Sequence, residues 1–397
     1  MFGELYSWYL RNPEYRSRVQ KLVQSAFAGK PKDIISQSVA KALYGEVSPY
    51  SATRLERFAA CAFAHFLQYG MKLTERVEYE FKPMDMGNVM HEALESFAEE
   101  VRKRGMKWTE LTEQERNEIA DRCLDNIVAD YGNTVLKSSA RNEYMIERTR
   151  RILRRTVWAL QKQLEQGEFQ PEGFEVTFGG GRIDRVDIME DQNKVYVKVI
   201  DYKTGNTSFD LVYLYHGLQL QLMIYLDGAL RVEQKKYPDK EIIPAGVFYY
   251  NIKDPMIQEK IDADVEAVSA GLMKELKMNG LVQADPELVY RMDSSLGSIP
   301  VAFNKDGSFR KNSSVADRTQ FAVLGRYVRT KIEKIRNSIL EGDAEVSPYE
   351  LGKKNACTYC PYMTVCGFDR RLSGYEFRRL KNFSDEELWK AFDREAE

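Results

Sequence analysis

The chain has 397 residues, of which 43% are hydrophobic and 30% are charged, and its formal net charge is −2. This composition is typical of a soluble protein that buries one large core or two modest ones. It excludes a uniformly basic nucleic-acid-binding protein, and no apolar run approaches the ~20 residues that span a bilayer, so we expect no membrane partner. The sequence carries no secretory signal, which favours a cytoplasmic location.

The first zone, residues 1–48, is predicted to be helical and carries no chemical motif. It ends at Tyr44-Gly-Glu-Val-Ser-Pro49, and we expect a second domain to cover residues 49–397. The chain contains no Gly-x-x-x-x-Gly-Lys-Ser/Thr phosphate loop. We therefore expect no ATP hydrolysis from this chain.

Two helices with functional candidates are predicted in the next part of the chain. The first runs from Gly87 to about Lys103 and contains His91 in its first turns. A lone histidine on a helix is more often structural than a metal ligand, so His91 becomes a candidate only in combination with other residues. The second helix, 141–166, carries the arginine-rich run 148–155. Such runs are usually solvated helix faces, but arginines that line a cleft for nucleic acid would hold the phosphate backbone. A second basic stretch, 326–336, can be interpreted in the same two ways.

The centre of the chain is predicted to form strands. A strand over 173–178 carries Glu175, which is either an exposed carboxylate or a weaker site candidate. Two further segments, 182–189 and 194–201, are rich in Val, Ile and Tyr and are separated by a Glu-Asp-Gln-Asn turn, so they predict a hairpin.

That hairpin brings two aspartates together. Asp184 and Asp201 converge toward one end of the sheet, where their carboxylates would suit Mg²⁺ or Mn²⁺, and the backbone carbonyl of Tyr202 can complete the ligand set. Lys203 shares a strand face with Asp201, because side chains two residues apart point the same way. An ammonium group there can orient the attacking water and offset negative charge at phosphorus. Asp-x-Lys is also common in surface hairpins, where it is only a solvated ion pair.

A helix over 209–232 follows directly and carries Gln221 and Tyr225 four residues apart, on one face. A core strand is predicted over 242–250, and two more helices over 264–278 and 317–340.

The five cysteines give a second, independent signal, because Cys357-x2-Cys360-x5-Cys366 places three thiols within ten residues. In a cytosolic protein such clusters usually hold metal. Three ligands leave a tetrahedral site one short, and the fourth must come from Cys61 or Cys123. Four thiolates suit Zn²⁺ as well as iron.

The series Gly87-x-x-x-His91, Asp184, Asp201-x-Lys203 and Gln221-x-x-x-Tyr225 resembles the RecB-like form of the PD-(D/E)XK nucleases. The resemblance implies an α/β fold, with a mixed central sheet flanked by helices and with helical additions. It also implies that His91, Asp184 and Asp201 hold the metal and that Lys203 assists the water. Gln221 and Tyr225 would line the site and the DNA path.

The segment 51–70, which contains Cys61, resembles the segment that opens the nuclease domain of AddB proteins in bacterial AddAB helicase-nucleases. Ala62 replaces the usual proline, which does not remove a ligand. The resemblance implies a 4Fe-4S cluster on Cys61, Cys357, Cys360 and Cys366, with Zn²⁺ as the alternative, and leaves Cys123 as a buried small hydrophobe. Such a cluster would clip the two ends of the domain together and contribute to its stability.

The resemblance therefore implies a Mg²⁺-dependent DNA exonuclease domain that acts with an AddA-like subunit in double-strand-break repair. Residues 1–48 would be the end of a helicase-like region. One alternative is a CRISPR-associated RecB-like exonuclease, which shares both motif sets but is usually much shorter. The other alternative is a non-catalytic DNA-end-binding or scaffolding module, against which the intact Asp184, Asp201 and Lys203 argue.

Overall fold

The computed structural model describes residues 2–26, 34–45, 51–74, 83–130, 139–179, 181–257 and 264–396. These form two compact units, each described here by itself. The cysteine unit comprises Met1–Ser48, Arg54–Glu75 and Glu333–Asn382, and the sheet unit comprises Pro49–Thr53, Arg76–Ile332 and Phe383–Glu397. The expected domain boundary at residues 48 and 49 lies outside the described residues.

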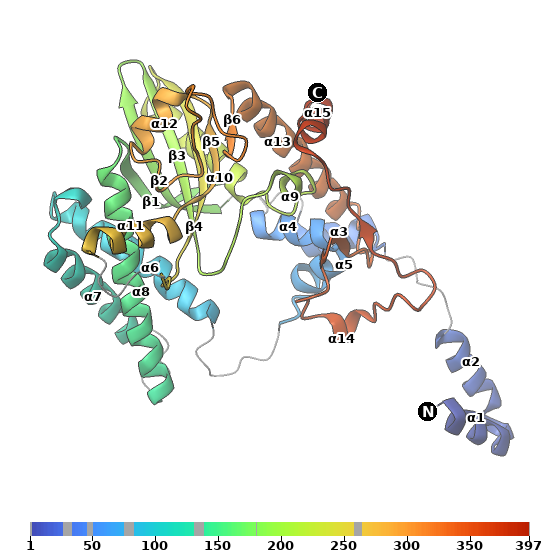
Figure 1. Ribbon diagram of the computed structural model, residues 1–397. Coiled ribbons are helices and arrows are strands. Elements are labelled where there is room, and N and C mark those ends of the chain that lie inside the picture. The colour runs from blue at the N-terminus through green and yellow to red at the C-terminus, as the bar shows by residue number, and fades with distance from the viewer. Residues whose placement is uncertain are drawn as a thin grey trace. The chain divides into compact units, whose positions relative to one another are not determined.

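The sheet unit is built on a six-stranded mixed sheet whose strands follow one another in chain order, β1 to β6 (Figure 1). The strands are β1 (Gln170–Phe178), β2 (Gly181–Asp191), β3 (Lys194–Lys203), β4 (Glu241–Asn251), β5 (Asn279–Gln283) and β6 (Val315–Ala316). β2 and β3 pair antiparallel, which confirms the predicted hairpin, while β3 and β4 pair in parallel. The predicted α/β class with a mixed sheet is therefore confirmed.

Helices cover both faces of this sheet. Three helices, α6 (Pro83–Lys103), α7 (Glu113–Asp130) and α8 (Ala140–Glu165), share one core with side chains of β3 and β4, among them Tyr202 and Tyr250. The parallel step from β3 to β4 requires a crossover connection, and α10 (Gln221–Lys236) makes it and packs on both strands. Side chains of a strand point alternately to the two faces of a sheet. Since helices cover both faces, β3 is almost entirely buried.

The predicted single helix over 209–232 is wrong, because the segment contains two helices. α9 covers Leu211–Tyr215, and α10 begins only at Gln221. Between them Gly217 has a φ of 77°, a conformation that glycine adopts readily and that ends a helix. The side chain of Gln219 then bonds the backbone of Ser208 and Asp210, which fixes the turn. As a result, Gln221 lies in the first turn of α10 and not in the middle of a helix.

The remaining helices of the sheet unit are η3 (Trp108–Glu110), α11 (Val265–Glu275), α12 (Pro286–Met292) and α15 (Asp385–Ala396), while α13 (Arg318–Leu340) crosses the division between the units. The cysteine unit contains α1 (Phe2–Arg11), η1 (Pro13–Tyr15), α2 (Arg16–Ala26), α3 (Gln37–Tyr44), α5 (Ala62–His65), the π-helix η2 (Phe66–Gly70) and α14 (Met363–Cys366), and α4 (Ala52–Ala60) lies largely in it. It also has a small sheet of β7 (Tyr349–Leu351), β8 (Lys354–Asn355) and β9 (Arg378–Arg379).

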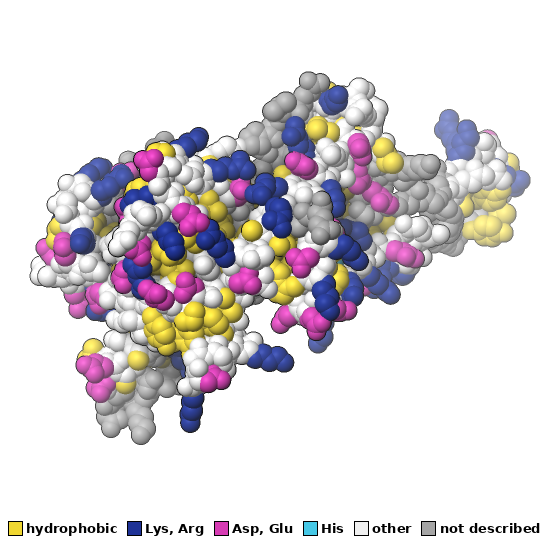
Figure 2. Space-filling view, turned by 90° about the horizontal axis from the view of Figure 1, so that it is seen from above, with side chains coloured by type: hydrophobic (Ala, Val, Ile, Leu, Met, Phe, Trp, Pro, Cys, Tyr) yellow, Lys and Arg dark blue, Asp and Glu magenta, His cyan; other side chains and the backbone are white. Residues whose placement is uncertain are grey.

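The surface carries both signs of charge. On the face drawn in Figure 2, basic side chains are interspersed with acidic ones. Among the described residues, no helix is both long and apolar enough to cross a membrane.

Candidate metal centre and cysteine pocket

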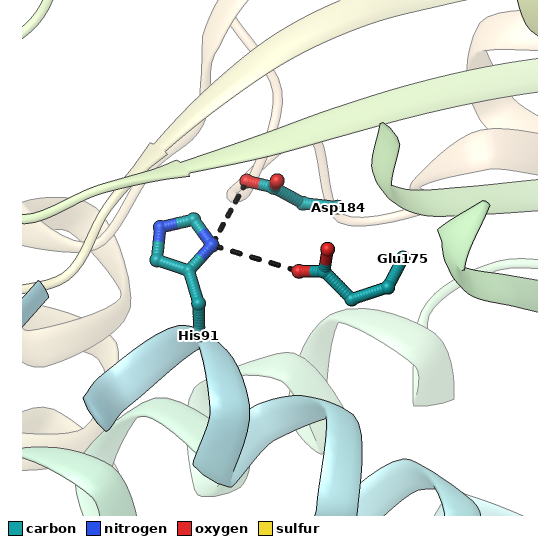
Figure 3. Close-up of side chains that lie close together, drawn as sticks. All are labelled: His91, Glu175 and Asp184. Carbon is teal, nitrogen blue, oxygen red and sulfur yellow. Dashed lines mark ion pairs between the residues drawn. The ribbon is translucent and has the colours of Figure 1, made fainter. Parts of the chain in front are cut away.

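Three side chains from three elements of the sheet unit meet at one point (Figure 3). His91 of α6 places its Nδ1 atom 3.3 Å from Oδ2 of Asp184 on β2 and 3.9 Å from Oε1 of Glu175 on β1. One nitrogen and two carboxylate oxygens all lie within 4.8 Å of one another. This donor set suits a divalent cation such as Mn²⁺ or Mg²⁺, because carboxylates are hard ligands and imidazole is accepted by many transition metals.

The histidine is brought to the sheet by the close approach of α6. Gly87, one turn before His91, lies next to Thr204, which directly follows β3; a Cβ atom added there would make an ordinary contact of 3.4 Å with the Thr204 hydroxyl. The start of α6 is thus packed against the end of β3. The ring of His91 then meets the edge of Tyr202 at a centroid distance of 6.0 Å.

Asp184 is held by the backbone of the neighbouring strand. Its Oδ2 atom accepts a hydrogen bond of 2.7 Å from the backbone N–H of Tyr202. That bond leaves the other carboxylate oxygen of Asp184 available and fixes the orientation of the group. The structure places Tyr202 at the centre through its N–H, and the expected role of its carbonyl as a ligand stays a prediction.

Glu175 occupies a more central position than the sequence indicated. The register of β1 and β2 pairs Phe174 with Arg185 and Val176 with Ile183, so Glu175 lies opposite Asp184. Its backbone has a φ of 49°, which is uncommon for a residue with a side chain and is costly unless the surroundings require it. Arg182 forms an ion pair with its carboxylate. The strand register and the positive φ were not visible in the sequence, where Glu175 is one acidic residue among many.

Asp201 lies beside this group, outside the set of atoms within 4.8 Å of one another. It is buried, and Lys203 places its Nζ atom 2.5 Å from the Asp201 Oδ2 atom. The same ammonium donates to Oε1 of Gln221 at 2.8 Å, and the Gln221 amide donates to the hydroxyl of Tyr225 at 2.9 Å. Asp201, Lys203, Gln221 and Tyr225 therefore form one continuous chain of polar contacts.

The electrostatics of the centre favour cations. Burial, together with the charge of Asp184, raises the pKa of Asp201 to about 7. Burial alone lowers the pKa of His91, but the carboxylates of Asp184, Glu175 and Asp201 outweigh it and raise that pKa to about 10. His91 and Asp201 therefore hold protons more tightly than usual, because the centre has an excess of negative charge. A divalent cation would neutralise that charge in place of the protons.

A second charged group lies beneath the centre and has a structural role. Asp187, although only three residues from Asp184, pairs with Arg185 at 2.6 Å and with Lys198 at 2.9 Å. All three side chains are buried, and Arg185 also lies over the ring of Trp108. Two cations share one carboxylate inside the core, and these contacts tie β2 to β3, so Asp187 has a structural role and Asp184 is the aspartate of β2 that lies at the site.

The four predicted cluster cysteines lie together in the cysteine unit. Cys61, Cys357, Cys360 and Cys366 line one small pocket. Burial and the neighbouring thiols raise the pKa of Cys357 to about 12, so this thiol retains its proton unless a metal displaces it. The backbone N–H of Phe368 donates to Sγ of Cys366 at 3.4 Å. The fifth cysteine, Cys123, is buried in the core of the sheet unit, as expected.

Known proteins resemble this chain over its whole length. The family model described as the PD-(D/E)XK nuclease superfamily matches residues 49–367. A protein of Lachnoclostridium phytofermentans, named as a subunit of an ATP-dependent helicase/deoxyribonuclease, is 41% identical over 100% of this chain and 36% of its own length. Proteins of the same name from Alkaliphilus metalliredigens and Clostridium acetobutylicum are each 34% identical over 100% of this chain, and the match covers 37% and 36% of them. The chain thus spans little more than a third of the length of these relatives.

Proposed function

The chain belongs to the PD-(D/E)XK nuclease superfamily, and on that basis we propose that it hydrolyses phosphodiester bonds in DNA at the centre formed by His91, Glu175 and Asp184. The observation that carries the proposal is the convergence of these three ligand groups next to the Asp201–Lys203 pair. A superfamily fold alone does not establish a reaction, so the proposal depends on the residues of the site.

Mg²⁺ or Mn²⁺ would be held by His91, Glu175 and Asp184, with Asp201 at the edge of the set. When bound, such a cation acidifies a water molecule and polarises the phosphate. The side chains supply the remaining contacts to the attacking water and the phosphate. Lys203 donates hydrogen bonds toward the attacking water and stabilises charge on the phosphate oxygens.

Gln221 and Tyr225 act as positioning residues for Lys203. Gln221 accepts a hydrogen bond from the lysine, and Tyr225 accepts one from the Gln221 amide. Because the ammonium also pairs with Asp201, its donors are directed by fixed partners and not by solvent. This arrangement reduces the reorganisation required when charge develops in the transition state.

The cysteine pocket is proposed to hold a 4Fe-4S cluster, with zinc as the alternative. Four thiols around one pocket provide the ligand count for either group. The test is iron, sulfide and zinc analysis of the purified chain, together with its visible absorbance, for the wild type and for Cys357→Ala and Cys123→Ala. Iron and sulfide that are lost only in Cys357→Ala support the cluster. A colourless, zinc-containing protein supports the alternative, and a metal-free protein contradicts both.

The wider role is inferred from the relatives, whose name describes one subunit of an ATP-dependent helicase and deoxyribonuclease. We infer that the chain is the exonuclease part of an AddAB-type enzyme, that an AddA-like protein is its partner, and that it acts on DNA during double-strand-break repair. These relatives favour this role over that of a CRISPR-associated exonuclease.

The reaction is tested by incubating labelled linear DNA with the chain in EDTA, Mg²⁺ or Mn²⁺. We expect cleavage only with a divalent cation, and none in Asp184→Asn, which retains the shape of the side chain. Glu92→Gln, an exposed change on the same helix as His91, is the matched control and should cleave normally. Cleavage in EDTA, or full activity in Asp184→Asn, would overturn the proposal.

A further inference from the structure

The sheet unit contains a groove of about 720 Å³ that lies between α7, α8 and α11. In the view of Figure 1, α11 crosses α8, and both helices line the groove. Its lining includes two glutamates and six arginines, an excess of four positive charges, and the arginines are Arg116, Arg148, Arg150, Arg151, Arg154 and Arg155. The metal centre uses none of these residues, so the groove requires its own explanation.

The arginines are arranged as a stripe along one helix face. Tyr144, Arg148, Arg151, Arg155 and Trp158 follow one another on α8 at intervals of four and three residues, which place them on one side of a helix. The stripe is about 21 Å long at 1.5 Å per residue. Its arginines are separated by about 4.5 and 6 Å along the axis. A stacked single strand advances ~3.4 Å per phosphate, so the stripe can follow several nucleotides.

Not all of these cations are neutralised by the protein. Arg150 and Arg154 are paired with acidic residues of α7, among them Asp121. By contrast, Arg148 and Arg155 have no acidic partner within the part of the chain that the structure describes, and the guanidinium of Arg155 lies 5.4 Å from the ring centre of Trp158. Within the described residues, the stripe thus presents two aromatic rings and two guanidinium groups that have no carboxylate partner.

The floor of the groove has unsatisfied hydrogen-bonding groups. Arg116 is only 6% exposed, and its Nη1 atom donates to Gln161 at 2.6 Å, while its Nε atom has no partner among the described residues. The adjacent Asn117 has a buried Oδ1 atom that likewise lacks a partner in the described structure. Buried polar groups are rarely left unpaired, so a donor and an acceptor on α7 remain to be bonded at this groove.

The opposite wall is apolar. Val265, Val268 and Leu272 of α11 line it, and Val265 is 81% exposed. A groove with cations along one wall and apolar and aromatic side chains along the other suits a molecule with a charged backbone and flat hydrophobic faces. An acidic peptide would match the cations but not the apolar wall.

We propose that this groove binds single-stranded DNA, with phosphates along the α8 arginines and bases against α11, Tyr144 and Trp158; the inference rests on the proposed nuclease function.

The groove and the metal centre are joined through the end of β4. Arg151 pairs with Asp254 at 2.6 Å, and Asp254 lies two residues after Ile252, whose N–H donates to the carbonyl of Lys203. Asp254, which contacts the groove through Arg151, is thus separated by two residues, at most about 7 Å of backbone, from Ile252, which pairs with the strand that carries Asp201 and Lys203.

The test is the binding of a labelled oligothymidylate to the whole chain in EDTA, which separates binding from cleavage. We expect Arg148→Gln/Arg155→Gln to weaken binding about tenfold and to reduce the slope of log affinity against log salt by about 1.4, since each single-strand phosphate contact contributes ~0.7. Tyr144→Ala should weaken binding about fivefold or more. Lys305→Gln/Lys311→Gln removes the same charge from a loop outside the groove and should leave binding unchanged.

The outcomes separate this inference from the proposed function. Unchanged oligothymidylate binding in Arg148→Gln/Arg155→Gln would overturn the proposal that the groove binds single-stranded DNA, even if the wild type cleaves DNA. Weakened binding in a chain that cleaves nothing would support the groove and contradict the nuclease. Displacement of the oligonucleotide by polyglutamate at equal concentration would assign the groove to an acidic protein segment and overturn the inference.

Discussion

Nζ of Lys203 lies 2.5 Å from Oδ2 of Asp201, inside a site where the aspartate is 1% exposed. The ammonium also bonds Gln221, so it is held between the proposed metal centre and α10. A buried carboxylate next to a metal centre thus has its own counter-charge, and the lysine is fixed before any substrate binds.

Lys203→Met should lower the rate of DNA cleavage by about 10²- to 10³-fold, the usual effect of removing one preorganised donor from a transition state. Metal and DNA binding should change little, because Lys203 is not among the ligand atoms. Single-turnover cleavage is the measurement, and Lys253→Met, at a half-buried lysine that pairs with Glu275, is the control. A wild-type rate in Lys203→Met would remove the lysine from the catalytic machinery.

Glu175→Gln should weaken Mn²⁺ binding by about 10- to 100-fold, because a charged ligand is replaced by a neutral amide. Calorimetric titration with Mn²⁺ measures this effect without any substrate. Glu172→Gln changes the same residue type on the same strand, where the carboxylate instead pairs with Lys236, and should bind the ion normally. Equal affinities in the two variants would place Glu175 outside the metal centre and leave its positive φ unexplained.

Gly228→Ala should destabilise the chain by about 1–3 kcal/mol, because the added Cβ atom overpacks a closed contact. That atom would lie 2.6 Å from the nearest ring carbon of Phe178, so either the ring or α10 must shift. Denaturant unfolding measures the loss, and Phe178→Leu should restore part of it. Gly325→Ala adds a methyl group with only an ordinary 3.7 Å contact inside α13, and it should leave stability unchanged or raise it by up to about 1 kcal/mol, since alanine favours a helix. Equal stability of both variants would show that α10 is not fixed at Gly228.

His65 should make the stability of the chain decrease as the pH falls. It is fully buried, and burial together with the charges of Arg54 and Arg57 lowers its pKa to about 3. In the unfolded chain a histidine takes up a proton below about pH 6.5. Between about pH 6.5 and pH 3 the unfolded state therefore binds more protons than the folded state. The free energy of unfolding thus decreases as the pH is lowered, and at pH 5 it is about 2 kcal/mol lower than at neutral pH.

His65→Gln removes that proton uptake, so the comparison is between pH slopes and not between absolute stabilities. The wild type should lose stability more steeply than His65→Gln between pH 7 and pH 5 in denaturant unfolding. Parallel pH profiles would mean that His65 is protonated in the folded chain, in conflict with its contact to Arg54.

Much of the fold and of the candidate site could be predicted because the site residues occur in short local motifs, each on a strand or helix that its own sequence pattern indicates. The hairpin of β2 and β3 is encoded by β-branched residues on both sides of a short turn, and its register brings Asp184 and Asp201 to the same end. The spacing of Gln221 and Tyr225 required only that the segment be helical, which held despite the error in its start. His91 needed the whole series of motifs, since one histidine on a helix carries little information.

Other features depend on contacts that no local pattern reports. The importance of Glu175 arises from the register of β1 and from a strained backbone, neither of which has a sequence signature. The helix break at Gly217 was missed because a single glycine inside an apolar segment is compatible with a continuous helix. The arginine-rich run of α8 was visible in the sequence, but the face that it occupies was not. The apolar wall opposite comes from α11, which lies far along the chain beyond the central strands.

The most direct test of the central claim is nucleotide release from end-labelled single- and double-stranded DNA in Mg²⁺ by the wild type and by Asp201→Ala. We expect release by the wild type and none by the variant, while circular dichroism and DNA binding remain unchanged. Release at the wild-type rate by a folded Asp201→Ala chain would contradict the assignment of this centre as the nuclease site.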